Sequence, residues 1–487
     1  MKKESSRRRF LKEGAALAGV AAVGGIQSVR GQIGGDGTRQ PGFVPEESVP
    51  KENVLLDPWT GEPLRDPEGN LVVDWTGSPQ WEAYRRRARA LGGPAYGMRE
   101  KDYRLYGYRS PYVTSFRLAS NGTSSAEPTS VKTPFLSLLS PIQHQSGIIT
   151  PNSLHFMDEH GFPQPDIDPR QHRLMIYGMV NRSVKLTMEE LMMRLPSVSR
   201  IHFIECNSNG TASHRSRLEP WATPGDIYGE FSCSEWTGVL LSTLLEMAGV
   251  QRGASWIWAE ATDSLNHAVS IPLEKAMDDC IVAYSQNGEP LRPENGFPLR
   301  LVAPGFEGIR SVKRLTRIKV ANEPGLFHRE TGAGYTDVRP DNKIRWFRFE
   351  MGAKSIILQP SGGQQLPGRG FYEMRGLAWS GGGKVRRVEV TTDGGRTWQD
   401  AQIQEPVFSK AATRFVFPWN WNGEEVTVAS RATDERGSTQ PTTAEMAEVW
   451  GVEPDYFRSA QRVWRFNVIQ PWKINREGRV TNEILAI

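Results

Sequence analysis

The stretch Arg200-Ile-His-Phe-Ile-Glu-Cys-Asn-Ser-Asn-Gly210 joins an apolar run to a polar turn that contains glycine. The apolar run predicts a β-strand, and Asn, Ser and Gly are typical of the turn that ends it. Cys206 therefore lies where the strand ends, at the rim of the predicted sheet. A thiolate there could be a nucleophile or a soft metal ligand. A buried, inert thiol is the alternative that this residue alone leaves open.

Strands and short helices alternate on both sides of this stretch. Thr187-Met-Glu-Glu190 has the pattern of a capping box that starts a helix. Asn287-Gly288 predicts a hairpin turn. The apolar spacing predicts helices at 238–249 and 273–277, and strands at 173–180, 256–261, 280–284, 297–302 and 312–320. These elements predict a mixed α/β catalytic domain over residues 141–322.

The sequence changes character after residue 322. Helical spacing fades, and short strands with Gly-rich turns follow at 376–379, 385–391, 397–403, 413–417 and 426–432. This spacing is typical of an immunoglobulin-like β-sandwich, which we place at residues 323–455. We expect the tail, residues 456–487, to pack back onto the body of the protein. The fold class is therefore α+β.

The N-terminal segment has the features of an export signal. Ser6-Arg-Arg-Arg-Phe-Leu-Lys12 matches the twin-arginine pattern, and an uncharged, weakly apolar stretch follows to Val29. This stretch is too short and too poor in Leu and Ile for a stable membrane span. We therefore predict a twin-arginine signal at residues 1–30 and a periplasmic protein; a short basic helix is the alternative. Residues 31–140 are read as an N-terminal arm and linker.

Composition excludes several classes of function. The net charge of +4 is small for 487 residues, and the sequence shows no basic stripe or nucleic-acid-binding module. The three cysteines, Cys206, Cys233 and Cys280, are far apart, which argues against structural zinc. No C-x-x-C-H motif attaches a haem to this chain. One disulfide is possible, but two buried thiols at Cys233 and Cys280 are favoured.

Several motifs occur in a fixed order around Cys206. They are Ile149-Thr-Pro-Asn-Ser-Leu-His-Phe156, Phe203-Ile-Glu-Cys-Asn-Ser-Asn-Gly210, Trp236-Thr-Gly-Val-Leu-Leu-Ser-Thr-Leu-Leu245, Val282-Ala-Tyr-Ser-Gln-Asn-Gly-Glu-Pro-Leu291, Gly296-Phe-Pro-Leu-Arg-Leu-Val-Ala-Pro-Gly305, Ile309-Arg-Ser-Val-Lys-Arg-Leu315, Gly376-Leu-Ala-Trp-Ser-Gly-Gly-Gly383 and Asp393-Gly-Gly-Arg-Thr-Trp398. Together they resemble the sulfite oxidase family of molybdopterin oxidoreductases, in both predicted domains.

A second group of motifs narrows this resemblance. It is carried by Glu205-Cys206, Asp278-Asp-Cys280, His328-Arg-Glu-Thr331, Tyr335-Thr-Asp337, Ala353-Lys-Ser-Ile356, Thr413-Arg-Phe415 and Ile469-Gln-Pro-Trp472. These stretches resemble the molybdenum subunits of Sox-type sulfite/sulfane dehydrogenases. That resemblance implies oxidation of an inorganic sulfur compound, electron transfer to a cytochrome c, and a homodimer or a heteromer with a cytochrome subunit.

The resemblance also implies roles for individual residues. The cofactor would be molybdenum–molybdopterin, with Cys206 as the metal ligand. His160 and Asn209 would bind the cofactor, and Arg310 and Lys313 would contact the pterin phosphate. Two further roles are expected from position and chemistry alone: Arg215, just after the cysteine turn, would draw an anionic substrate inward, and His267 would take part in proton transfer, since histidine titrates near neutrality. For Arg310, Lys313, Arg215 and His267 the alternative is a charged or polar group with a purely structural place.

Two positions depart from the family pattern. Sulfite oxidases have an Arg two residues before the pterin-contacting His, whereas Asp158 and Glu159 precede His160 here. A Tyr expected before the Ser-Ile-Pro element is absent, and His267 lies in its neighbourhood. Because an acidic side chain repels sulfite, these changes favour a different substrate. The alternatives are a related molybdenum reductase that acts on a sulfoxide, and a cofactor-free exported scaffold protein.

Overall fold

The computed structural model of the chain describes residues 26–29, 54, 62–63, 65, 71–74, 115, 117–119, 136–159, 164–211, 219–263, 266–332, 335–338, 343–459 and 463–483. Its contacts divide the chain after Thr114 into two units. In the first unit, β1 (Ile26–Val29) pairs antiparallel with β2 (Leu71–Asp74). The rest of the predicted twin-arginine segment lies outside the described residues.

The second unit begins with a five-stranded mixed sheet. Its order is β11 (Ala268–Pro272), β10 (Trp256–Ala261), β15 (Leu315–Ala321), β6 (Arg173–Gly178) and β7 (Val184–Thr187). Only the pair β15–β6 within it is parallel. One face packs on α6 (Leu241–Ala248) and α7 (Leu273–Asp278), around buried aliphatic side chains such as Ile176, Leu244, Ile257 and Ile318.

A second sheet carries the cysteine stretch. Its path is β13 (Glu289–Pro290), β12 (Ile281–Gln286), β9 (Phe231–Leu240) and β8 (Val198–Glu205), and β14 (Arg300–Val302) also pairs with β12. β8 ends at Glu205, directly before Cys206, so the predicted strand and its end are confirmed. A small third sheet consists of β3 (Leu118–Ala119), β4 (Leu136–Leu139) and β5 (Met157–Glu159). Its strand β5 places Asp158 beside the cysteine stretch.

Helix starts follow local capping. Thr187 caps α4 (Met188–Met193) in the predicted capping box with Glu190, and Thr223 caps α5 (Pro224–Tyr228) in the same way. The prediction of helix from residue 238 is wrong, because residues 238–240 belong to β9 and α6 begins at Leu241. A Cβ at Gly238 would lie 2.1 Å from the Val282 carbonyl oxygen, so the strands approach too closely there for any side chain.

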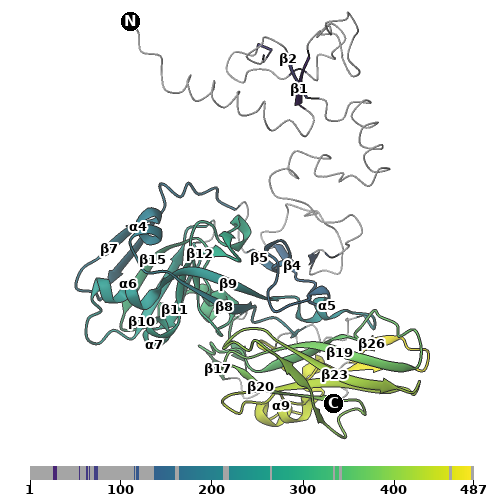
Figure 1. Cartoon of the computed structure of the whole chain (residues 1–487). Coiled ribbons are helices and arrows are strands. Elements are labelled where there is room, and N and C mark those ends of the chain that lie inside the picture. The colour runs from purple at the N-terminus through teal and green to yellow at the C-terminus, as the bar shows by residue number, and fades with distance from the viewer. Residues whose placement is uncertain are drawn as a thin grey trace, which may run out of the picture. The chain divides into compact units, whose positions relative to one another are not determined.

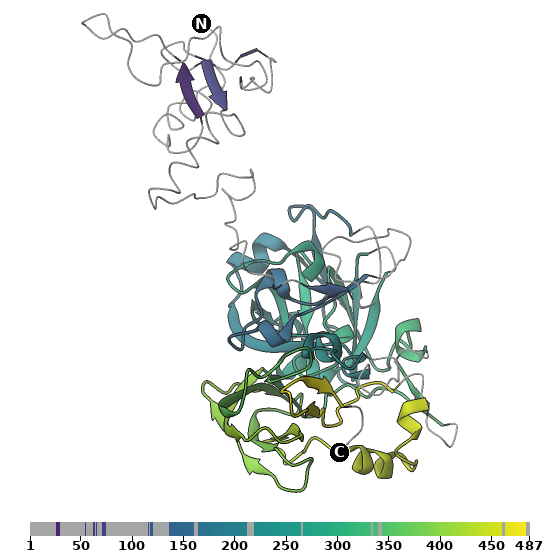
Figure 2. The same cartoon turned by 90° about the vertical axis from the view of Figure 1, so that its right-hand side faces the viewer.

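The C-terminal half forms the expected β-sandwich (Figures 1 and 2). One sheet is β18 (Lys354–Gln359), β19 (Gly370–Trp379), β23 (Thr413–Trp421) and β22 (Gln402–Gln404). The other is β21 (Gln399–Asp400), β20 (Val385–Thr391), β24 (Val426–Asp434), β25 (Trp472–Ile474) and β26 (Val480–Asn482). The tail therefore supplies two strands of the second sheet. The α+β fold class is confirmed.

Short elements join these layers. The 3-10 turns are η3 (Ile142–His144), η4 (Asn152–Leu154), η6 (Pro293–Asn295) and η7 (Gly308–Arg310). Between the domains lie α8 (His328–Thr331) and the strands β16 (Asp337–Val338) and β17 (Ile344–Arg345). Two helices, α9 (Thr443–Trp450) and α10 (Tyr456–Ser459), follow β24.

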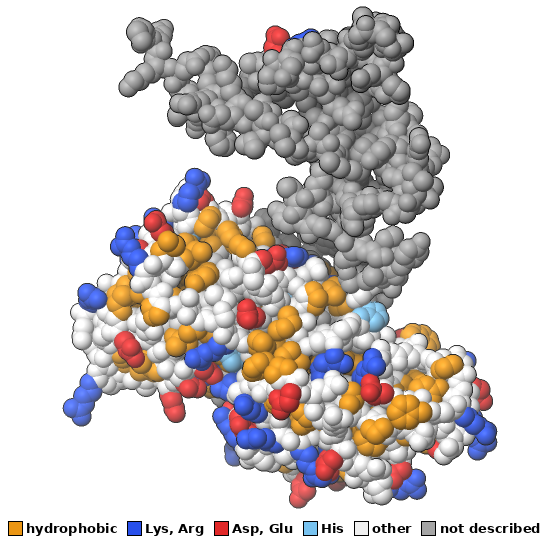
Figure 3. Space-filling view, viewed as in Figure 1, with side chains coloured by type: hydrophobic (Ala, Val, Ile, Leu, Met, Phe, Trp, Pro, Cys, Tyr) orange, Lys and Arg blue, Asp and Glu red, His pale blue; other side chains and the backbone are white. Residues whose placement is uncertain are grey.

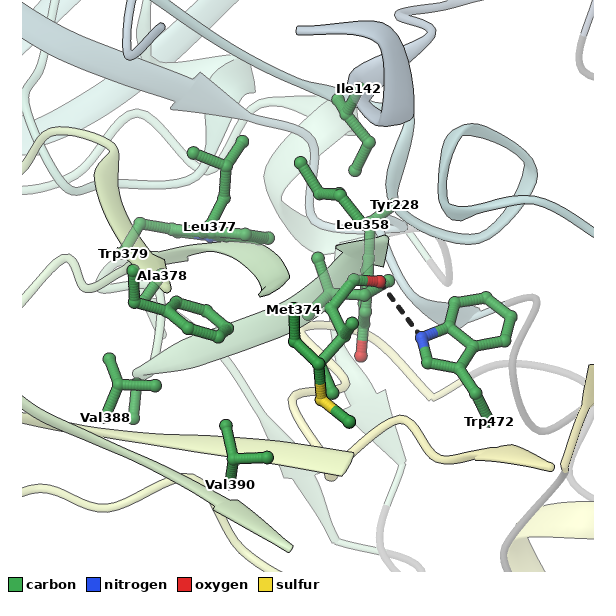
Figure 4. Close-up of a cluster of buried hydrophobic side chains, with 14 of the residues drawn as sticks. Ile142, Tyr228, Leu358, Met374, Leu377, Ala378, Trp379, Val388, Val390 and Trp472 are labelled. Atoms are coloured by element: carbon green, nitrogen blue, oxygen red, sulfur yellow. Dashed lines mark hydrogen bonds between the residues drawn. The ribbon is translucent and has the colours of Figure 1, made fainter. Parts of the chain in front are cut away.

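The core of the sandwich continues into the α/β domain that precedes it in the chain, called the first domain from here on. Ile142 and Tyr228 of the first domain lie in the same buried cluster as Met374, Leu377 and Trp379 of the sandwich (Figure 4). The Phe231 ring stacks on Trp379 with 4.1 Å between centroids. Contacts of this size between large aromatic side chains contribute strongly to the packing of one domain on the other.

Two further findings bear on the sequence expectations. Cys206, Cys233 and Cys280 are all free thiols, and Cys233 and Cys280 are buried as expected. In the described part of the chain, no helix is both long and apolar enough to span a membrane. On the face shown in Figure 3, Lys and Arg side chains are interspersed with Asp and Glu.

Candidate cofactor site

A cavity opens at the end of β8. It encloses ≈ 730 Å³ including its open mouth, and Cys206 forms part of its wall. The other lining residues come from β5, β8, η6, β14, η7, α8 and the neighbouring loops: His155, Phe156, Asp158, Glu159, Ile204, Asp263, His267, Asn295, Arg300, Gly308, Ile309, Ser311, Val312, Lys313, Arg314, Arg329 and Tyr335.

The backbone around Cys206 forms a tight, hydrogen-bonded turn. The Cys206 N–H donates to the Glu230 carbonyl (3.0 Å), and the Cys206 carbonyl accepts from the Asn209 N–H (3.0 Å). The Asn209 side-chain oxygen in turn accepts from the Glu230 N–H (3.1 Å). The turn therefore fixes the direction in which the cysteine leaves the strand.

Acidic groups surround the thiol. The Cys206 sulfur lies 3.1 Å from the Ser208 hydroxyl and 3.6 Å from a carboxylate oxygen of Asp158. The Ser208 hydroxyl donates to Glu230. Burial, together with the carboxylates of Glu230 and Asp158, raises the pKa of the Cys206 thiol well above its usual value. A thiolate at this position therefore needs a cation beside it, such as a bound metal.

A basic corner occupies another part of the cavity wall. Arg314 donates to one oxygen of Glu159 at 2.6 Å, and Lys313 lies 3.4 Å from the other oxygen. Lys313 also donates to the Asp158 carbonyl at 3.1 Å. Burial would raise the pKa of Glu159, but Lys313 and Arg314 lower it by more, so this carboxylate stays ionised.

Arg300 is the third cation of this corner. Its guanidinium donates to two backbone carbonyls, of Asn295 (2.8 Å) and Ser311 (2.9 Å), and lies over the Trp236 ring. Within the described residues it has no carboxylate within ion-pair distance, and its Nε has no hydrogen-bond partner. Burial, then repulsion from Arg314, lowers the pKa of Arg300 to about 9. A buried cation in this state favours an anionic ligand.

His155 presents a hydrogen-bond acceptor at the cavity. Its Nδ1 lies 2.9 Å from the Phe156 carbonyl oxygen, so Nδ1 carries the proton and Nε2 is left with a lone pair. Nε2 is buried and has no partner in the described structure. Burial lowers the pKa of His155 to about 3, so the ring is neutral near pH 7. A ligand with an N–H or O–H group would satisfy it.

The predicted site residues divide between the cavity and its surroundings. Cys206, Lys313 and His267 all line the cavity. The His267 Nε2 lies 3.3 Å from the Ile309 carbonyl oxygen, so this nitrogen donates a hydrogen bond there. His160 and Arg215 lie outside the described residues, and their roles remain predictions.

Arg310 and Asn209 do not line the cavity. The Arg310 guanidinium forms buried ion pairs with Glu307 (3.0 Å) and with Glu330, and donates to the Ser270 carbonyl. The charge of Arg310 is therefore balanced by carboxylates behind the cavity wall. This position favours a purely structural role for Arg310 over a role in phosphate binding. Asn209 supports the cysteine turn from behind through Glu205.

Arg465 of the tail ties the cavity wall together. Its backbone N–H donates to the Asn207 carbonyl (2.6 Å), next to Cys206. Its side chain forms ion pairs with Glu307 (3.0 Å) and Asp337 (2.9 Å), and all three side chains are buried. The tail therefore fixes the cysteine turn relative to the segment that contains Asp337. Tyr335, which lines the cavity, lies two residues before Asp337 in the same segment.

Five cavity residues with side chains suited to ligand contact were not assigned from the sequence: His155, Arg300, Arg314, Arg329 and Tyr335. All five lie inside or beside motifs that carried the family resemblance. Arg314 directly follows Lys313, for example, and Arg300 lies in the Gly296–Gly305 motif. Burial raises the pKa of the Tyr335 hydroxyl, so it remains protonated and is able to donate a hydrogen bond.

Comparison with known families supports the cofactor. The model of the "Oxidoreductase molybdopterin binding domain" family matches residues 160–327. The model of the "Mo-co oxidoreductase dimerisation domain" family matches residues 345–463. The two matches cover both domains around the cavity, and they confirm the expected cofactor class, molybdenum–molybdopterin, and the oxidoreductase class.

Individual proteins similar to this chain are also oxidoreductases. The crystal structure of the sulfane dehydrogenase SoxCD from Paracoccus pantotrophus is similar, with a TM-score of 0.71 and 34% identity, covering 79% of this chain and 94% of that chain. Nitrate reductase [NADH] of Solanum lycopersicum is 34% identical over 379 residues, or 69% of this chain. Nitrate reductase [NAD(P)H] of Hordeum vulgare is 34% identical over 338 residues.

These relatives differ in how much of them this chain covers. The chain spans 40% of the length of the Solanum lycopersicum enzyme and 37% of that of the Hordeum vulgare enzyme. It spans almost the whole SoxCD chain that it matches. With family models over more than half of its length and a structural relative covered nearly end to end, the chain belongs to the sulfite oxidase family of molybdopterin oxidoreductases.

Proposed function

We propose that this chain is the catalytic subunit of a periplasmic molybdenum dehydrogenase that oxidises an inorganic sulfur compound and passes electrons to a cytochrome c. One observation carries the proposal: the Cys206 thiol shares a single cavity with a basic corner of the buried Arg300 and Arg314 and the partly exposed Lys313. A soft sulfur ligand suits a molybdenum centre, and the basic corner suits the phosphate of the pterin.

The residues of this cavity fit the cofactor. Arg300, which has no carboxylate partner in the described structure, and Lys313 would hold the phosphate group. The lone pair of His155 Nε2 would accept a hydrogen bond from the pterin. Cys206 would bind the metal, and the positive charge would favour its thiolate. When bound, the cofactor supplies two-electron oxygen-atom transfer, while the protein orients it and shapes the surrounding field.

The surroundings of Cys206 favour a substrate with little negative charge on its reacting sulfur. Asp158 lies 3.6 Å from the sulfur of Cys206, and Glu230 lies behind Ser208. These carboxylates repel sulfite, a small dianion, more than they repel sulfane sulfur. The likeness to a sulfane dehydrogenase supports the same choice. Arg329, Tyr335 and His267 line the cavity and would contact the substrate or move its proton.

The sequence and the same comparisons support a choice of electron acceptor and of assembly. The absence of a haem-attachment motif from the sequence agrees with a separate cytochrome as the electron acceptor. The match to a dimerisation domain supports a homodimer or a heteromer with a cytochrome subunit. The twin-arginine pattern supports export in the folded state, as a protein loaded with its cofactor in the cytoplasm requires.

The experiment is a purification from a host that makes the cofactor, followed by metal analysis and steady-state assays. We expect molybdenum and pterin in the wild type and no activity in Cys206→Ser. Sulfite, thiosulfate and sulfane compounds are assayed with an artificial electron carrier and with cytochrome c. Turnover in metal-loaded Cys206→Ser would refute the ligand assignment.

A reductive role is the second candidate, and the match to nitrate reductases favours it. The same assays therefore include nitrate and a sulfoxide with a reduced carrier. Reduction of either compound, without oxidation of any sulfur substrate, would overturn the proposed direction of catalysis. Absence of both molybdenum and pterin from the purified wild type would refute both enzymatic functions and leave the cofactor-free scaffold.

A further inference from the structure

Glu205, the residue directly before Cys206, has an unusual environment. Its side chain is fully buried, and its carboxylate accepts three hydrogen bonds. The donors are Lys354 Nζ (2.5 Å), Asn209 Nδ2 (2.8 Å) and Trp379 Nε1 (2.8 Å). A buried carboxylate with three donors, one of them cationic, is fully compensated. Glu205 therefore has one well-defined position.

Two of these donors come from the other domain. Lys354 begins β18 and Trp379 ends β19, and the two residues lie opposite each other in the paired strands of the sandwich. Lys354 has no exposed surface and lies over the Tyr228 ring. Its ammonium also donates to the Asn209 carbonyl at 3.1 Å. One lysine of the sandwich thus contacts the residues at both ends of the cysteine turn.

The turn depends on these contacts. Asn209 closes the turn by donating from its backbone to the Cys206 carbonyl, and its side chain spans Glu205 and the Glu230 N–H. With Lys354 removed, Asn209 loses one partner and Glu205 becomes a buried, unpaired charge. A buried ion pair adds little net stability over an apolar pair of similar size. Its contribution here is therefore the geometry that it imposes on the turn.

We propose that Lys354 and Glu205 are positioning residues, through which the β-sandwich sets the direction of the Cys206 side chain at the cavity. The sandwich thus acts on the metal ligand itself, in addition to any part it has in assembly. The importance of this positioning for catalysis rests on the proposed function, in which Cys206 binds the metal. The positioning itself is a property of the protein without cofactor and is testable there.

The test is the alkylation rate of each cysteine in cofactor-free protein, followed by mass spectrometry. Cys206 is half-buried, whereas Cys233 and Cys280 are buried and serve as internal controls. We expect Lys354→Met to raise the alkylation rate of Cys206 about tenfold, because local opening of the turn becomes more frequent. The rates of Cys233 and Cys280 stay unchanged. An unchanged Cys206 rate, or an equal rise at all three cysteines, would overturn the proposal.

A matched control is available at the same domain interface. Lys410 of the sandwich pairs with Asp279 of the first domain at 2.5 Å, and both side chains are mostly buried. This pair does not touch the cysteine turn. Lys410→Met therefore removes an ion pair between the domains without changing the alkylation of Cys206. If Lys410→Met raised the Cys206 rate as much as Lys354→Met, the effect would be general loosening of the interface and the proposal would fail.

A double variant separates stability from position. Glu205→Gln/Lys354→Met removes both charges, so it restores the stability that Lys354→Met loses. The Asn209 carbonyl still lacks its lysine, and we expect fast alkylation of Cys206 to persist. A wild-type rate in the stable double variant would refute positioning. In metal-loaded protein, X-ray absorption at molybdenum measures the Mo–S distance. We expect this distance to be altered in the double variant and unaltered in Lys410→Met. An unaltered distance in the double variant would count against the proposal.

Discussion

Arg314 and Glu159 form an ion pair of 2.6 Å, and both side chains are almost completely buried. Glu159 is one of the two acidic residues that depart from the sulfite oxidase pattern. Its carboxylate lies against Arg314 and Lys313, where it neutralises part of the basic corner. Of these two acidic residues, Asp158 is the one whose carboxylate contacts the sulfur of Cys206. The departure from the family is therefore two separate changes, with two separate consequences.

Glu159→Gln should destabilise the cofactor-free protein. Among the described residues, Arg314 would then keep Asp263, at 3.6 Å, as its carboxylate partner, and Lys313 would keep no carboxylate within ion-pair distance. Breaking a buried pair from one side costs about 3 kcal/mol or more, and urea denaturation measures this loss. Glu373→Gln is the control, since its pair with Arg375 is exposed and contributes less than about 1 kcal/mol. Equal losses in the two variants would contradict our account of the pair.

Arg300→Met should have the opposite pattern. It removes a buried charge that lacks a carboxylate partner in the described structure, which offsets the loss of the two hydrogen bonds to the Asn295 and Ser311 carbonyls, so the stability of the cofactor-free protein should change little. The affinity for the cofactor should fall about tenfold to a hundredfold, because a charge-assisted hydrogen bond to the phosphate is lost. Pterin and molybdenum content of the purified protein measures this effect. Full cofactor content would remove Arg300 from the phosphate site.

Lys313→Ala and Arg310→Ala should differ, although both residues were predicted from one motif. Lys313 lines the cavity and is partly exposed, so its loss should lower pterin content with little effect on folding. Loss of Arg310 leaves Glu307 and Glu330 with less compensation, which costs about 3–5 kcal/mol. Thermal melts of cofactor-free protein and pterin content together separate the two roles. A stable Arg310→Ala protein without pterin would restore Arg310 as a phosphate ligand.

Stability should fall as the pH drops below about 6.5. Burial lowers the pKa of His202 to about 4 and that of His155 to about 3. Between those values and the unfolded pKa near 6.5, the unfolded chain binds protons that the folded chain refuses. Each histidine therefore removes about 1.4 kcal/mol of stability per pH unit in its window.

The variant His202→Leu tests this pH dependence. The free energy of unfolding, measured in urea at several pH values from 7 to 4, should fall less steeply in the variant, by about one proton. His144→Gln is the control, because His144 is exposed. A slope in His202→Leu identical to that of the wild type would show that His202 does not titrate in this range.

Much of the fold could be predicted from local sequence. The apolar run before Cys206, the capping box at Thr187 and the Asn287-Gly288 turn each depend on neighbours along the chain, and the structure confirms all three. The helix predicted from residue 238 failed because Gly238 lies against the backbone of Val282, a residue distant in sequence. Strand pairing of this kind overrides local helical spacing.

The candidate site was less predictable for the same reason. The motif with Arg310 and Lys313 has two cations, but only burial shows that Arg310 is balanced by Glu307 and Glu330. Likewise, no spacing in the sequence indicates that Lys354 reaches Glu205 across 149 residues. The predicted strand end indicated the position of Cys206. Its charged neighbours, in contrast, are brought to it by packing between residues far apart in the sequence.

The position of Arg465 has a consequence for the order of events during synthesis. This residue contacts Asn207 beside Cys206, and the strands β25 and β26 that follow it complete a sheet of the sandwich. These residues leave the ribosome after every other described part of the cavity wall. A nascent chain that stops short of them has the cysteine but lacks the clamp that holds its turn. Stable insertion of the cofactor is therefore expected only after translation of the tail.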